Sequence, residues 1–172
     1  WEVKCTNWGR PLEPTSSEKA SSYKSRYLDY IAADKAHCVG SFVFLWGQKQ
    51  ERTPTWYGVF LENGNHTEAA QIMEALWTGK VPKHKTPGSP KLPINGGVAA
   101  DSILLSQGKQ YRAQVTCEYP KNSSINSRWE LMAEVKKALE SDGGDFEPKS
   151  DILWRHDDLR TSDSLTFKAP DA

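Results

Sequence analysis

The chain has 172 residues, of which 37% are hydrophobic and 26% are charged. Its 22 Lys and Arg residues balance its 22 Asp and Glu residues, whereas a nucleic-acid-binding domain normally carries a basic excess. The longest apolar run, residues 39–46, is far shorter than the roughly 20 residues of a membrane-spanning helix. We therefore expect no nucleic-acid partner and no membrane insertion.

The numbers and spacing of cysteine and histidine argue against a disulfide-bonded or metal-binding protein. The three cysteines are widely spaced, and the four histidines share no spacing typical of metal ligands. We therefore expect no disulfide scaffold, no metal and no cofactor. The seven tryptophans are many for this length, and an indole suits both a core and the flat apolar face of a ligand.

The first 78 residues alternate between helix and strand patterns. A capping box of Thr15 and Glu18 opens a helix predicted over residues 16–34. The apolar residues of 39–46 are continuous, which is typical of a strand buried on both faces of a parallel sheet. A second helix with an apolar stripe is predicted over residues 67–77 and ends at Gly79. This alternation predicts an α/β domain over residues 1–78.

A change of composition marks the middle of the chain. Residues 79–97 contain four prolines among Lys, Gly and Ser, which predicts a semi-extended linker. Short strands are then expected at residues 102–105, 111–117, 128–131 and 165–167. These strands, with frequent turns, predict an all-β sandwich over residues 98–172, and the spacing of Cys117 and Trp129 resembles that of an immunoglobulin-like core. Both domains are shorter than such folds require, so we expect a truncated chain.

Two motifs resemble the end of a clan A glycoside hydrolase barrel, in particular glycoside hydrolase family 2-like TIM-barrel proteins. They are WGRPLEPTS at residues 8–16 and GSFVFLWGQKQERTPTW at residues 40–56. RWEL at residues 128–131 and GGDFEP at residues 143–148 resemble the immunoglobulin- or cadherin-like module that follows such barrels. The resemblance implies the last βα part of a (β/α)8 barrel, a proline-rich linker and an incomplete immunoglobulin-like β-sandwich.

The resemblance also implies a sugar-binding site. Trp46 matches the sugar-stacking aromatic residue at the end of the eighth barrel strand, and the loop that follows carries donors and acceptors for hydroxyl groups. Two roles remain open for Trp56, which either extends the sugar-binding site or packs against the protein. Two also remain open for Glu51 and Arg52, which either recognise sugar or form a structural pair that braces the loop. The candidate substrate-binding residues are Trp46, Gln48, Glu51, Arg52 and Trp56.

Two functions follow from the resemblance. The first is a fragment of a retaining glycoside hydrolase that cleaves a poly- or oligosaccharide, with both catalytic carboxylates outside this chain, so that the fragment alone is inactive. The alternative is a non-catalytic carbohydrate-binding or cell-surface adhesion protein with a decayed barrel. In both cases residues 98–172 are expected to act as a spacer, the partner is a carbohydrate, and the protein is secreted, periplasmic or at the cell surface.

Overall fold

The structure is a computed structural model that describes residues 3–83, 85–119, 121, 123, 126–134, 148–158 and 163–171. Residues 143–147 of the GGDFEP motif lie outside these ranges. The chain divides into two compact units. The helical unit comprises Pro14–Gly88 and Val135–Lys149, and the strand unit comprises Trp1–Glu13, Ser89–Glu134 and Ser150–Ala172.

The first helix begins as the sequence predicts. α1 spans Ser16–Arg26 and continues into a π-helical turn over Tyr27–Ile31. The Glu18 amide donates to Thr15 Oγ1 at 3.2 Å, and the Thr15 amide donates to Glu18 Oε2 at 2.7 Å. The capping box is therefore confirmed, because each side chain satisfies a backbone N–H that has no partner within the helix.

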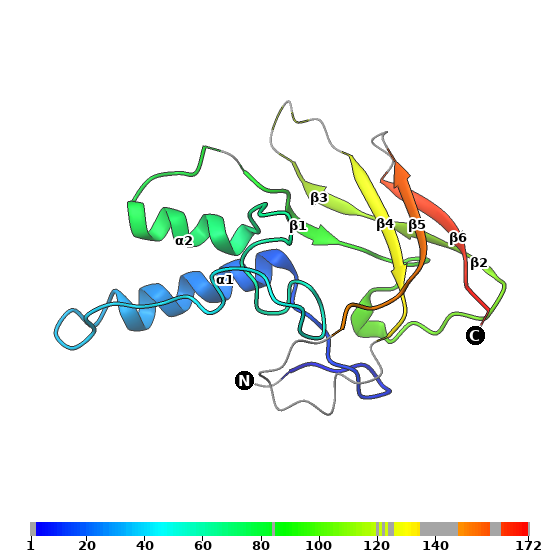
Figure 1. The fold of residues 1–172 in the computed structure, drawn as a ribbon, viewed down its shortest axis with the longest axis horizontal. Helices are drawn as coiled ribbons and strands as arrows, with labels where there is room; N and C mark the ends of the chain where they lie inside the picture. The colour runs from blue at the N-terminus through cyan, green and yellow to red at the C-terminus, as the bar shows by residue number, and fades with distance from the viewer. Residues whose placement is uncertain are drawn as a thin grey trace. The chain divides into compact units, whose positions relative to one another are not determined.

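The second helix, α2, spans Glu68–Thr78 and ends at Gly79, as predicted. Gly79 adopts a left-handed conformation (φ 68°), which glycine tolerates without a Cβ clash. α1 and α2 lie side by side (Figure 1). Alanines let the two helices approach closely, and the small core of the unit is formed by Val59, Ala69 and Ala70, with Tyr23, Val43 and Phe60 packed against it.

The prediction of a buried barrel strand at residues 39–46 is wrong. The segment forms no strand, and Val39 and Phe42 are fully exposed. Burial alternates after Phe42, with Val43 and Leu45 half-buried and Phe44 and Trp46 exposed. A continuous apolar run does not by itself separate burial on two faces from burial on one, and here only one side is covered.

The expected (β/α)8 barrel part is therefore also wrong. Leu45 bonds through its backbone to Tyr57 and Val59, which follow it closely in the chain, and not to parallel barrel neighbours. The described residues form two short helices and six short strands, and these strands form no closed sheet. Among these residues no helix is both long and apolar enough to cross a bilayer.

The six strands form three separate two-stranded sheets. The sheets pair β1 with β3, β2 with β6 and β4 with β5, and the last two pairs are antiparallel (Figure 1). The strands are β1 (Gly88–Lys91), β2 (Gln110–Gln114), β3 (Thr116–Glu118), β4 (Ser127–Met132), β5 (Ile152–Asp158) and β6 (Ser164–Lys168). β1 falls within residues 79–97, for which the sequence predicted a linker.

Three of the four predicted strands are confirmed in position. Residues 111–117 form β2 and β3 with an interruption at Val115, and residues 128–131 and 165–167 lie in β4 and β6. The prediction for residues 102–105 is wrong, because a 3₁₀ turn over Ala99–Asp101 leads into irregular backbone there and Leu104 is 81% exposed.

The expected immunoglobulin-like sandwich is wrong as well. A sandwich packs two multi-stranded sheets around large side chains, whereas these strands form isolated pairs. The described residues of the strand unit that are buried are small: Ser102, Ala113 and Ala169. Cys117 and Trp129 lie in different sheets, because β3 pairs with β1 and β4 pairs with β5. Alternation predicts the two faces of a strand but not its pairing partner.

Candidate functional site

Two tryptophans from distant parts of the helical unit lie beside each other. Trp46 follows the irregular segment after α1, and Trp77 lies in the last turn of α2. Their ring centroids are 5.5 Å apart with an interplanar angle of 41°, and the Phe60 ring packs against Trp46 in a T-shaped arrangement with centroids 4.9 Å apart. Trp46 is 54% exposed and Trp77 is 43% exposed, so both indoles are held in place while much of each faces solvent.

Further aromatic side chains are exposed in the same unit. Phe42 and Phe44 precede Trp46 at alternate positions, and Phe44 is 64% exposed. The Tyr57 ring lies 5.7 Å from that of Phe44 and is itself partly exposed. We call the set formed by Phe42, Phe44, Trp46, Tyr57 and Trp77 the aromatic surface.

The backbone beneath these rings is anchored to α1. Tyr23 donates from its hydroxyl to the Phe44 carbonyl at 2.7 Å. Burial raises the pKa of the Tyr23 hydroxyl, and the nearby Arg26 charge opposes this effect in part. The hydroxyl therefore keeps its proton, and with it this hydrogen bond, throughout the neutral pH range.

Residues 47–58 form a loop whose ends are tied together. The Leu45 amide donates to the Tyr57 carbonyl at 3.2 Å, and the Phe60 amide donates to the Gly47 carbonyl at 3.2 Å. Lys19 of α1 donates to the carbonyls of Thr55 and Trp56 at 2.5 and 3.3 Å. These contacts place the loop beside the segment that carries Phe44 and Trp46.

The polar residues predicted to recognise sugar hydroxyls contact other parts of the same loop. Gln48 Nε2 donates to the Pro54 carbonyl at 3.3 Å, and Glu51 forms an ion pair with Lys49 at 2.9 Å. The Arg52 guanidinium lies 4.8 Å from the ring centroid of Trp56, which is a cation–π arrangement. Gln50 is buried, and its Oε1 has no hydrogen-bond partner among the described residues.

The predicted tryptophans make separate ring contacts. Trp46 contacts Phe60 and Trp77, whereas Trp56 and Tyr57 form a T-shaped pair with ring centroids 6.5 Å apart. Trp77 and Phe44 were not among the predicted site residues. The alternate spacing of Phe42, Phe44 and Trp46 was a usable signal for one exposed side, but the approach of Trp77 depends on the packing of α2.

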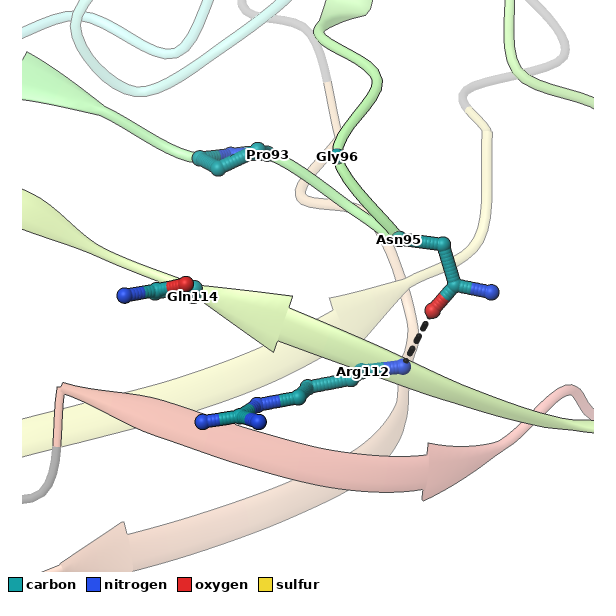
Figure 2. A pocket seen from close by; sticks show the side chains of 5 residues that line it. All are labelled: Pro93, Asn95, Gly96, Arg112 and Gln114. Atoms are coloured by element: carbon teal, nitrogen blue, oxygen red, sulfur yellow. Dashed lines mark hydrogen bonds between the residues drawn. The ribbon is translucent and has the colours of Figure 1, made fainter.

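The strand unit contains a shallow concavity of about 240 Å³ (Figure 2). Arg112 and Gln114 of β2 form one side, and the turn that carries Asn95 and Gly96, together with Pro93, forms the other. The Arg112 guanidinium donates to Ser164 Oγ of β6 at 3.1 Å. The lining residues therefore carry one positive charge and no negative charge.

Within the described ranges no three His, Cys, Asp or Glu side chains are grouped closely enough to hold a metal ion. A search against models of protein families found no match to the chain, and a search of curated proteins found none either. Within the described residues, the aromatic surface and the Arg112 concavity are surfaces with defined chemistry.

Proposed function

We propose that the helical unit binds carbohydrate without cleaving it, through its aromatic surface. The observation that carries the proposal is the Trp46–Trp77 pair, two indoles that contact each other and are each about half exposed. A pyranose ring has a flat face of C–H groups, and an indole presents a flat apolar face of similar size. Exposed apolar groups that cluster in this way are typical of an interaction site.

The contacts that hold the exposed rings in place favour a ligand-binding role over aromatic side chains that are merely exposed. Phe60 holds Trp46 edge to face, and Tyr23 anchors the backbone at Phe44. A ring that is already fixed loses little conformational entropy when a sugar stacks on it. Indole NH and Tyr57 hydroxyl groups in the same set supply hydrogen bonds for sugar hydroxyls.

The non-catalytic alternative is preferred for a specific reason. The glycosidase interpretation depended on a barrel that the described residues do not form, and its two carboxylates were expected outside this chain. The polar residues of the 47–58 loop are also engaged within that loop, as the Lys49–Glu51 ion pair illustrates. Sugar binding by stacked aromatic rings needs neither the barrel nor a carboxylate pair.

The test compares three tryptophan variants of the full chain. Trp46→Ala and Trp77→Ala each remove one indole of the pair, and Trp8→Ala removes an indole of the strand unit that is 49% exposed. Binding is measured on a panel of neutral polysaccharides and then by calorimetry with the best oligosaccharide. We expect Trp46→Ala and Trp77→Ala to weaken binding about tenfold or more, equivalent to about 1.4 kcal/mol, and Trp8→Ala to have no effect.

Two results would overturn the proposal. One is an unaltered chain that binds no polysaccharide of the panel. The other is a Trp46→Ala variant that melts at a much lower temperature while its folded fraction binds as tightly as before, because Trp46 would then serve packing alone. Trp46→Phe, which keeps an aromatic ring, is expected to retain part of the affinity.

A further inference from the structure

The concavity of the strand unit has the features of a small polar binding site. Arg112 and Gln114 are two residues apart on β2, so their side chains leave the strand on the same face (Figure 2). Ser164 of β6 lies opposite Gln114 in the antiparallel register. The turn at Asn95 and Gly96 closes the other side.

Both the backbone and the guanidinium of Arg112 are hydrogen-bonded. Its amide donates to Asn95 Oδ1 at 2.8 Å, and its carbonyl accepts from the Asn95 amide at 2.8 Å. At the tip, Nη2 donates to Ser164 Oγ at 3.1 Å. A guanidinium has five N–H donors, and this bond uses one of them. The side chain is exposed, so its other donors are open to a ligand in a fixed orientation.

The lining residues define the ligand chemistry. A planar guanidinium binds a carboxylate through two parallel hydrogen bonds, and no acidic side chain of the lining competes for it. The side-chain amides of Gln114 and Asn95 offer both donors and acceptors, which suit hydroxyl groups. The Pro93 ring adds one apolar wall, and a volume of about 240 Å³ is small enough to select a single ring.

We propose that this concavity binds a carboxylated sugar unit, a hexuronate, with its carboxylate on Arg112 and its hydroxyl groups on Gln114 and Asn95. The carboxylate follows from Arg112 alone, whereas the sugar class rests on the proposed function of the helical unit. The site would add recognition of acidic sugars to a protein whose aromatic surface binds neutral rings.

The test is an NMR titration of the full chain with sodium glucuronate. Glucose serves as the neutral probe and sodium acetate as the bare carboxylate. We expect glucuronate to shift the amide signals of Asn95, Arg112 and Gln114 saturably, and to bind at least tenfold more tightly than either glucose or acetate. Arg112→Gln is expected to lower the glucuronate affinity at least tenfold, and Arg112→Lys, which keeps the charge but loses the planar fork, is expected to lower it less.

The matched control is Arg128→Gln, which removes an exposed arginine of the same unit that pairs with Asp157. It should leave glucuronate binding unchanged. The proposal is overturned if glucuronate produces no saturable shift, if acetate binds as tightly as glucuronate, or if Arg112→Gln binds like the unaltered chain. The fold of the Arg112→Gln variant is verified by unchanged amide signals of β4 and β5, which form a different sheet.

Failure here is distinguishable from failure of the aromatic surface. The proposed function is judged by Trp46→Ala and neutral polysaccharides, whereas the uronate site is judged by Arg112→Gln and glucuronate. Trp46→Ala should therefore leave the glucuronate titration unchanged, and a loss of glucuronate binding in that variant would overturn the assignment of the ligand to Arg112.

Discussion

Asn95 and Arg112 are joined by two hydrogen bonds that run in opposite directions. The Arg112 amide donates to Asn95 Oδ1, and the Asn95 amide donates to the Arg112 carbonyl, both at 2.8 Å. Asn95 and Gly96 have φ values of 47° and 88°, and the turn is closed by reciprocal bonds between Ile94 and Gly97. Asn-Gly is the sequence preferred for such a turn. The turn is thereby fixed against β2, and with it the shape of the concavity.

Replacing Asn95 should separate the roles of its backbone and side chain. Asn95→Ala loses the Oδ1 acceptor and places at positive φ a residue that tolerates the left-handed region less well than Asn, so we expect a loss of about 2 kcal/mol. Asn95→Gly also loses the acceptor but adopts the positive φ without steric cost, and we expect about 1 kcal/mol. Amide hydrogen exchange at Arg112 measures both effects, and exchange should accelerate more in the alanine variant. Equal exchange in the two variants would contradict a role for the positive φ.

Gly58 is required by the close approach of backbone atoms in the 47–58 loop. A Cβ at this position would lie 2.9 Å from the Gly47 carbonyl oxygen and 3.2 Å from Gln48 Cα. These are backbone atoms that cannot rotate away, so we expect Gly58→Ala to destabilise the helical unit by about 1–3 kcal/mol. Urea unfolding followed by Trp fluorescence measures the loss.

Gly40 provides the matched control for Gly58. A Cβ built on Gly40 meets no atom within 4 Å, and its φ lies outside the positive range. Gly40→Ala should therefore unfold at nearly the same urea concentration as the unaltered chain. If both variants are equally stable, the loop does not have the close backbone contact described.

The capping box of α1 gives a third prediction. Thr15→Ala removes the acceptor for the Glu18 amide, and we expect a loss of about 1 kcal/mol in the stability of the helical unit. Thr15→Ser keeps the hydroxyl and should recover most of that loss. Circular dichroism at 222 nm during urea unfolding compares the two. A serine variant as unstable as the alanine variant would show that the methyl group of Thr15, and not its hydroxyl, matters.

Local signals in this sequence were reliable where the structure depends on neighbouring residues. Thr15 and Glu18 cap α1 because both partners lie within one turn, and Gly79 ends α2 because it alone of the nearby residues accepts a left-handed backbone without strain. Alternation located β2, and short strand-like segments at residues 128–131 and 165–167 located β4 and β6. β5 was missed because Ile152, Leu153 and Trp154 are consecutive apolar residues followed by charged ones, which breaks the alternation.

Long-range features were not predictable in the same way. The apolar residues at 39–46 are compatible with a segment buried on one face or on two faces. The contacts of Leu45 with Tyr57 and Val59 decide between these cases, and they are not visible in the sequence. Trp46 and Trp56 were predicted to be ligand-binding residues from the resemblance to a glycoside hydrolase barrel. The contact between Trp46 and Trp77 depends on how α2 packs, and no local sequence pattern predicts that packing.

The charged face of β4 and β5 gives a pH prediction. Arg128 Nε donates to Asp157 Oδ1 at 2.7 Å, and this hydrogen bond is the main reason why the pKa of the Asp157 carboxyl lies below its usual value of 3.8. The Arg128, Arg155 and His156 charges add to the lowering, whereas desolvation opposes it. Because the folded state binds this proton less tightly than the unfolded chain, the pair stabilises the folded state above about pH 3.8.

That contribution is lost as the pH falls through the lowered, folded-state value of Asp157. It should be small and weaken in salt, because both side chains are exposed. A ¹³C NMR titration of the Asp157 carboxyl measures the shift directly, and Arg128→Gln should move its midpoint upward towards the usual value. Arg112→Gln should leave that midpoint unchanged, because the Arg112 guanidinium bonds to Ser164 in a different sheet. A midpoint that stays the same in Arg128→Gln would mean that the cross-strand pair does not persist in solution.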